Sequence, residues 1–247
     1  MRIALFSDIH ANREAFDACL APAARQRVER MVFLGDLVGY GADPIYVADR
    51  VRLEIGRGAL AIQGNHDEAA VSGDTRNMND YARAALDWTH ATIDADTRDF
   101  LAGLPMSVEE EDRLFVHSEA SRPKSWIYVT GADVAERSLV ATGQRLTFCG
   151  HIHRPQLYHQ ASGRPPKFFA PITGAAAPLI ATRKWLGVIG SVGQPRDENP
   201  SAAWCLLDTT LNEITYFRAA YDIDRAAAKI RAAGLPQILA ARLFIGR

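Results

Sequence analysis

Short polar motifs follow directly after apolar, strand-like runs at several points of this 247-residue chain. The first three motifs contain Asp8, Asp36 and Asn65, so that 28 and then 29 residues separate them. One strand with its crossover helix takes about 30 residues, and this spacing therefore predicts successive parallel βαβ units. In such sheets ligands bind beyond the carboxyl ends of the strands. The spacing predicts an α/β fold whose polar motifs gather at one edge of a sheet.

Hydrophobic periodicity places the elements of this fold along the chain. The first half alternates between strands and helices, with Asn12 as N-cap of the first helix. Residues 155–219 contain short strands without long helices, which predicts a second, mostly antiparallel sheet. Because motifs come from both halves, we expect one domain over residues 1–247, with two packed sheets flanked by helices. The predicted strands are residues 2–7, 31–35, 59–63, 106–108, 114–117, 145–149, 156–159, 167–170, 184–190, 202–207 and 213–218, and the predicted helices are residues 11–30, 44–55, 81–93, 96–104, 131–142, 222–233 and 237–244.

The composition excludes several classes of protein. Hydrophobic residues make up 48% of the chain and charged residues 23%, which is ordinary for a soluble globular protein. The formal net charge of −1 gives no support to a broad nucleic-acid or acidic-membrane surface. The three cysteines lack CxxC spacing and predict neither a disulfide framework nor a thiolate metal site. No apolar run is long enough for a membrane span or a signal peptide, and we expect a cytoplasmic protein.

Histidine is concentrated in the motifs. Five of the seven histidines lie in them, and neutral histidine is the commonest metal ligand. Pairs such as Asp8 and His10, two residues apart, face the same side of an extended strand. Seven candidate ligands exceed what one catalytic metal usually takes from a protein and suffice for two ions that share Asp36, the arrangement used for phosphoryl chemistry. Imidazole, carboxylate and amide ligands suit Mn, Fe or Zn. The candidates are Asp8, His10, Asp36, Asn65, His117, His151 and His153.

His66 is assigned a different role from the ligands. It follows the candidate ligand Asn65 and is expected to point elsewhere, where it can protonate a leaving alkoxide or hydrogen-bond phosphoryl oxygens. Asp67 is expected to cap a loop or helix. Trp126 and Tyr128 are expected to fill the core rather than stack on a base. The candidate substrate contacts are Asn12, Tyr40, Arg154 and Arg196.

The complete series of motifs resembles that of a known family. In order, the motifs read DxH from Asp8, GDxxG from Gly35, GNHD from Gly64, a lone His117 and GHxH from Gly150. This series is similar to the calcineurin-like metallophosphoesterase family, and within it to a small bacterial branch of predicted phosphodiesterases. Three longer segments carry the same resemblance, namely GDLVGYG at 35–41, GHIHRP at 150–155 and GSVGQPRD at 190–197.

The resemblance implies a four-layer α-β-β-α sandwich of two mixed sheets. It also implies two metal ions, a metal-bridging hydroxide that attacks phosphorus in line, and His66 as acid or transition-state stabiliser. The Ser/Thr phosphatase branch has an Asp-Arg pair where this chain has Gly39 and Tyr40. That difference weakens a protein-phosphatase interpretation and leaves the orienting partner of His66 unidentified. The first ion would be held by Asp8, His10, Asp36 and His153, and the second by Asp36, Asn65, His117 and His151.

The leading hypothesis is a binuclear-metal-dependent phosphoesterase, first of all a phosphodiesterase, acting on a small phosphate ester or a nucleotide. A second hypothesis is a dinucleoside polyphosphate or nucleotide pyrophosphohydrolase, because the same metals can carry out that chemistry. A protein phosphatase is a weaker alternative. A non-catalytic binding scaffold on the same fold belongs to a different class, and scaffolds of this kind tend to lose motif residues. The presence of His66 and of all seven candidate ligands argues against it.

Overall fold

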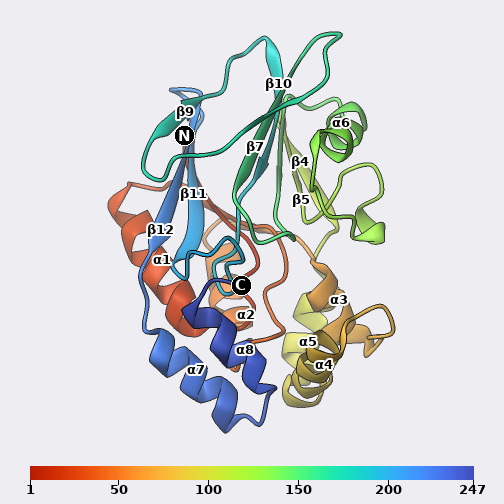
Figure 1. The fold of residues 1–247 in the computed structure, drawn as a ribbon, viewed down its shortest axis with the longest axis vertical. Coiled ribbons are helices and arrows are strands. Elements are labelled where there is room, and N and C mark those ends of the chain that lie inside the picture. The colour runs from red at the N-terminus through yellow and green to blue at the C-terminus, as the bar shows by residue number, and fades with distance from the viewer.

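The structure, a computed structural model, describes residues 1–247 and contains two six-stranded sheets (Figure 1). Both sheets are mixed. In the first sheet β1, β2 and β3 are parallel and the other strands run antiparallel to their neighbours. The first sheet has the order β3 (Leu60–Ala61), β2 (Arg30–Phe33), β1 (Arg2–Phe6), β11 (Ala202–Asp208), β12 (Glu213–Ala219), β9 (Ala176–Pro178). The second has the order β4 (Ser107–Glu110), β5 (Arg113–Val116), β6 (Leu146–Cys149), β10 (Arg183–Val188), β7 (Gln156–Ala161), β8 (Lys167–Phe169).

Helices cover the outer faces of the two sheets. α1 (Arg13–Arg25) packs on β11 and β12, and α6 (Ala132–Val140) packs on β10 and β7 of the other sheet. This is the α-β-β-α sandwich that the resemblance implies. No helix has the length and apolar character needed to cross a bilayer. The remaining helices are α2 (Pro44–Ile55), α3 (Asn65–Ser72), α4 (Asp80–Thr92), α5 (Ala95–Ala102), α7 (Ile223–Ala232), α8 (Gln237–Ala241), and the 3-10 helices η1 (Pro123–Ser125) and η2 (Arg242–Phe244).

Alternating side chains of the strands build the core on both faces of each sheet. In β1, Ile3 and Leu5 face the second sheet, whereas Ala4 and Phe6 face the helices. Successive residues of a strand point to opposite faces, so a strand that is buried on both sides is apolar throughout. This explains why residues 3–6 form an uninterrupted apolar run that ends just before the first motif.

Three expectations about the elements need correction. The strands of residues 155–219 do not form a separate sheet, because β9, β11 and β12 join the first sheet and β7, β8 and β10 join the second. The first helix is shorter than residues 11–30, since α1 ends at Arg25. The sequence pattern also missed α3 and β9. A strand's partners depend on contacts between distant segments, which local periodicity does not record.

Candidate metal centre

Every candidate ligand lies just beyond the carboxyl end of a strand. β1, β2 and β3 are parallel neighbours, and so are β5 and β6 in the other sheet. The two sheets therefore deliver their loops to the same edge, and all seven side chains are buried there. By position, Asp8 and His10 follow β1, Asp36 follows β2, Asn65 begins α3 after β3, His117 follows β5, and His151 and His153 follow β6.

Tight turns, not extended strands, determine the orientation of these side chains. β1 ends at Phe6 and β6 at Cys149, so the argument that residues i and i+2 of a strand share a face is wrong here. Non-glycine residues rarely adopt a left-handed backbone, and where they do the surrounding structure must hold them in place, commonly at functional sites. The angle φ is positive, between 50° and 72°, at Asp8, His10, Asp36, His151 and His153.

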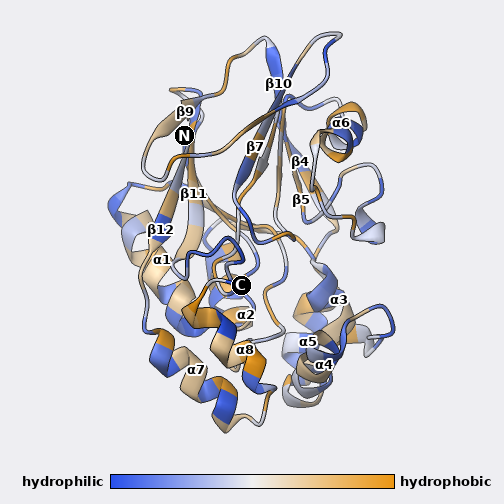
Figure 2. Ribbon diagram, viewed as in Figure 1, coloured by the Kyte–Doolittle hydropathy of each residue, from blue (hydrophilic) through white to orange (hydrophobic).

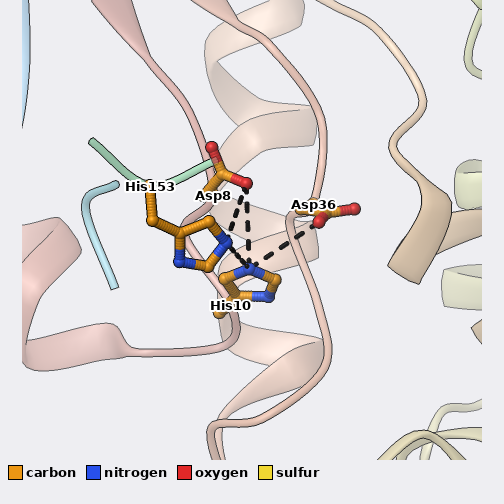
Figure 3. A group of neighbouring side chains, drawn as sticks. All are labelled: Asp8, His10, Asp36 and His153. Carbon is orange, nitrogen blue, oxygen red and sulfur yellow. Dashed lines mark hydrogen bonds and ion pairs between the residues drawn. The ribbon is translucent and has the colours of Figure 1, made fainter. Parts of the chain in front are cut away.

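A first group of donor atoms is contributed by Asp8, His10, Asp36 and His153, whose side chains converge in Figure 3. The Nε2 atoms of His10 and His153 are 3.1 Å apart, and His153 Nε2 lies 3.2 Å from Asp8 Oδ1. His10 Nε2 lies 3.7 Å from Asp36 Oδ2. Ligand atoms bound about 2.0–2.2 Å from one ion lie about 3–3.5 Å from one another. The spacing of this group fits a first-row metal ion.

A second group shares Asp36 with the first. The other donor atoms of this group lie around His117 Nε2, which is 3.3 Å from Asp36 Oδ2. The same nitrogen lies 3.2 Å from Asn65 Oδ1 and 3.2 Å from His151 Nδ1. The oxygen Asp36 Oδ2 is therefore close to the nitrogen atoms of both groups. Asp36 is therefore the residue that the two donor groups have in common.

Backbone carbonyls fix the orientation of all four histidines in these groups. Each ring donates one N–H to a carbonyl, and because a carbonyl can only accept, that nitrogen must carry the proton. In a neutral ring the other nitrogen then presents a lone pair to the group, which is the usual arrangement of metal-binding histidines. The pairs, at 2.6–3.1 Å, are His10 Nδ1 with Val38, His117 Nδ1 with Leu34, His151 Nε2 with Trp126 and His153 Nδ1 with Gln194.

Backbone N–H groups orient the two carboxylates, each through one of its oxygen atoms. Asp8 Oδ2 accepts the backbone N–H of His151 at 3.0 Å, and Asp36 Oδ1 accepts that of His66 at 2.8 Å. The other oxygens, Asp8 Oδ1 and Asp36 Oδ2, face the donor groups. Asp8 Oδ1 is buried and has no hydrogen-bond donor. An unpaired buried carboxylate oxygen is costly, and a cation at this point would satisfy it.

Burial and neighbouring charges shift the pKa values of these groups. Burial lowers the pKa values of His10 and His153, so their facing nitrogens are both unprotonated at neutral pH. Burial also disfavours charge on His117, but the carboxylate of Asp36 outweighs it and raises the His117 pKa to about 9. Burial alone would raise the pKa of Asp36, yet His117 and His66 hold it well below its ordinary value. The centre therefore combines ionised carboxylates with the facing lone pairs of His10 and His153, which is the donor chemistry of a metal site.

His66 differs from the four histidines in one respect. Neither of its ring nitrogens has a hydrogen-bond partner in the protein, and Nδ1 is buried. Its ring lies 4.8 Å from that of His10 and 4.5 Å from that of Tyr40. Gly39 makes this position possible, because a Cβ atom there would lie 2.5 Å from His66 Nδ1. The ring is thus next to the donor groups, with both nitrogens uncommitted.

Asp67 fastens two of the site loops together. Its carboxylate accepts the backbone N–H groups of Gly64 at 2.9 Å, Leu37 at 2.9 Å and Val38 at 3.2 Å. The first of these caps α3, as expected from the sequence. The other two connect α3, which carries Asn65 and His66, to the loop that carries Asp36.

The four candidate substrate contacts occupy different surroundings. Asn12 caps α1, with Oδ1 accepting from Ala15 N at 3.1 Å and Nδ2 donating to the Gly193 carbonyl at 2.9 Å, so its amide is already engaged. Tyr40 is buried beside His10. Arg196 lies over the Tyr40 ring, 5.6 Å from its centroid. Arg154 is exposed and donates to the Arg196 carbonyl at 2.7 Å. The two arginines therefore lie together at the mouth of the site.

The prediction that Trp126 and Tyr128 fill the core is wrong. Tyr128 is 47% exposed, and its ring stacks on that of His151 with centroids 4.1 Å apart. Trp126 donates its indole N–H to Glu68 at 3.0 Å and supplies the carbonyl that orients His151. The pattern of apolar residues gave no sign of this, because a backbone carbonyl acts independently of the side chain. Tyr128 also lines an open cavity of about 300 Å³ with Arg154 and Arg196.

Comparison with known proteins agrees with this geometry. The chain is 32% identical over 253 residues to an uncharacterized protein of Methanocaldococcus jannaschii, with 99% of this chain and 98% of that protein covered. Its fold matches the crystal structure of a metallophosphoesterase from Sphaerobacter thermophilus with a TM-score of 0.87 and 33% identity, covering 100% of this chain and 99% of that one. A hypothetical protein from Pyrococcus horikoshii, 16% identical, shares the fold with a TM-score of 0.80 over 100% and 98% of the two chains.

The two-sheet fold with buried Asp and His residues at one edge defines the class to which the chain belongs. Residues 1–211 match the calcineurin-like phosphoesterase superfamily domain. The chain is a member of this metal-dependent family, as the motif series indicates.

Proposed function

We propose that this protein is a binuclear-metal-dependent phosphoesterase, with a phosphodiester as its preferred substrate. The observation that carries the proposal is the pair of donor groups that meet at Asp36. The first ion would be bound by Asp8, His10, Asp36 and His153, and the second by Asp36, Asn65, His117 and His151. When bound, two such ions supply Lewis acidity that activates water and polarises phosphoryl oxygens.

The residues around the proposed ions orient the donor atoms and keep bulk water away from the carboxylates. Four carbonyl-anchored imidazoles hold the donor atoms rigidly, so no reorganisation is needed when substrate binds. The left-handed turns are held by backbone hydrogen bonds between the loops, for example from His10 N to the Asp36 carbonyl at 2.9 Å. Burial of both carboxylates keeps bulk water from screening their charges.

His66 is the proposed catalytic residue. Its two ring nitrogens are not used by the protein, whereas every ligand histidine has one nitrogen on a carbonyl and one in a donor group. An imidazole N–H at this place can hydrogen-bond the phosphoryl oxygens or pass a proton to the leaving oxygen. Tyr40, which lies against the His66 ring, restricts its rotation.

Two features favour a diester over a phosphoprotein as substrate. The Asp-Arg pair of the Ser/Thr phosphatase branch is replaced by Gly39 and Tyr40, and the Tyr40 side chain is buried. The open cavity of about 300 Å³ next to His151 offers space for a second ester group. Exposed Tyr128 provides a flat surface for it.

A substrate panel tests the proposal. Purified protein supplied with Mn²⁺ is assayed with an aryl phosphomonoester, a bis-aryl phosphodiester, cyclic nucleotides and pyrophosphate. We expect the diester to have the largest kcat/KM and His66→Ala to abolish most of that activity with metal content intact. A protein that binds two ions but hydrolyses none of these compounds would contradict the proposal and support a binding scaffold.

A further inference from the structure

Arg196 and Arg242 converge on one oxygen atom beside the metal centre. Gln194 Oε1 accepts from Arg196 Nη2 at 2.8 Å and from Arg242 Nη1 at 3.2 Å. Neither guanidinium forms an ion pair with a carboxylate, and Arg242 Nε is buried without any partner. Like charges this close repel each other, and partial burial adds a desolvation cost. Two neighbouring guanidinium groups without a counter-ion favour the binding of an anion.

Gln194 connects this arginine pair to the proposed metal ligands. Its backbone carbonyl accepts the Nδ1–H of His153 at 2.6 Å, while its side-chain oxygen accepts from both arginines. Arg196 also lies over Tyr40, whose ring touches those of His10 and His66. The arginine pair is therefore separated from the metal centre by a single residue on either path.

The second arginine comes from the C-terminal segment of the chain. Arg242 begins η2, and its neighbour Leu243 is buried in one apolar cluster with Tyr40 and residues of α7 and α8. Apolar and polar residues alternate along α7 and α8 in Figure 2, as expected for helices that pack on one side only. In the view of Figure 1 the C-terminus lies near the centre, below the labels of β11 and β12. Residues 212–247 lie outside the part that matches the family domain, so Arg242 is not among the residues that this domain includes.

We propose that Arg196 and Arg242 bind a second phosphoryl group of the substrate, adjacent to the one that is hydrolysed. The inference rests on the proposed function, whose substrate class it narrows to phosphodiesters that carry a second phosphoryl group next to the one that is hydrolysed. A guanidinium offers a fork of N–H donors that matches phosphate oxygens, and the Gln194 amide oxygen is the neutral acceptor on which the two forks already meet. Arg154, at the rim of the cavity that Arg196 lines, adds a third positive charge.

Equilibrium binding of two non-hydrolysable probes tests the proposal. Methylenediphosphonate carries two phosphoryl groups and methylphosphonate carries one, and their dissociation constants on Mn²⁺-loaded protein are measured by calorimetry. We expect Arg242→Ala to lower the ratio of the two affinities at least tenfold, which is about 1.4 kcal/mol. Arg231→Ala is the matched control, because Arg231 is exposed on α7 and forms no ion pair. It should leave the ratio at the wild-type value.

Gln194→Glu supplies the missing carboxylate and separates binding from folding. The substituted side chain has the same shape and would pair with both arginines, so we expect a melting temperature no lower than that of the wild type and the same loss of preference for methylenediphosphonate. An affinity ratio that stays at the wild-type value in both Arg242→Ala and Gln194→Glu would overturn the proposal, and so would a wild-type protein that binds the two probes equally. These measurements need no turnover. A failure to hydrolyse any ester would therefore contradict the proposed function and not this result.

Discussion

Two irregular regions of the molecule differ in the side chains that they bury and expose. The site loops, which follow β1, β2, β3, β5 and β6, bury carboxylates and imidazoles almost completely. The β8–β9 segment, residues 162–182, leaves large apolar side chains exposed, with Phe168 at 56% and Ile172 at 66%. Burying polar groups costs free energy unless every group is paired. The site loops meet this condition through backbone carbonyls and amides, except at Asp8 Oδ1, His66 Nδ1 and Ser7 Oγ, which are buried without a hydrogen-bond partner.

This difference predicts in which region a substitution should have the larger effect on activity and stability. In the site loops the candidate ligand side chains have defined partners, and a change removes chemistry as well as contacts. In the β8–β9 segment most side chains have few partners to lose. Four substitutions test this contrast.

The largest effect is expected from Asp36→Ala, which removes the one carboxylate common to both donor groups. Loss of the charge stabilisation that metal ions give, several kcal/mol, should lower kcat/KM for a diester by about three orders of magnitude or more. Steady-state kinetics in excess Mn²⁺ measures this. An activity within tenfold of the wild type would show that Asp36 is not a shared ligand.

His66→Ala should rank second, with kcat lower by about 10²–10⁴-fold, the range for loss of a general acid. Because His66 is not in either donor group, metal content measured on the same sample should equal that of the wild type. Loss of metal together with activity would instead make His66 a ligand.

Gly39→Ala tests the placement of His66 without removing it. The new Cβ atom would meet His66 Nδ1, and φ is +85° at this residue. We expect kcat to fall about tenfold, roughly a 1.4 kcal/mol change in barrier. Gly58→Ala is the matched control, since φ is +97° there and nothing lies within 4 Å. Both variants should lose about 1 kcal/mol of stability from the strained backbone. Equal activity in the two variants would argue against a tightly placed His66.

The smallest effect is expected from Phe168→Ser in the β8–β9 segment. An exposed substitution of this kind changes the free energy of unfolding by about 0.5 kcal/mol or less, and we expect activity within about twofold of the wild type. Chemical denaturation and the diester assay measure the two quantities. A large loss of either would show that this segment resembles the site loops after all.

Much of the fold followed from local patterns in the sequence. The helix over residues 44–55 has the predicted bounds, and the parallel order of β1, β2 and β3 agrees with the βαβ spacing. The assignment of the later strands to the two sheets did not follow from local patterns, because β10 pairs with both β6 and β7 through contacts between distant residues. Periodicity describes one segment at a time and carries no information about its neighbours in space.

The same limit applies to the site. Side chains with distinctive chemistry, such as Asp8 and His153, were visible in the motifs. The groups that orient them were not, since Gln194 and Trp126 act on histidines through their backbone carbonyls. Arg242 lies far from every motif in the sequence and reaches Gln194 only because the C-terminal helices fold back onto Tyr40.

Metal stoichiometry tests the central claim most directly. The account predicts about two ions per chain for the wild-type protein, as in other binuclear centres. Because His10 belongs to the first donor group only and His151 to the second only, His10→Ala and His151→Ala should each retain about one ion, and Asp36→Ala fewer than one. Elemental analysis of the four purified proteins decides the matter. Equal metal content in all four, or none in the wild type, would contradict the claim that these two groups are metal sites joined at Asp36.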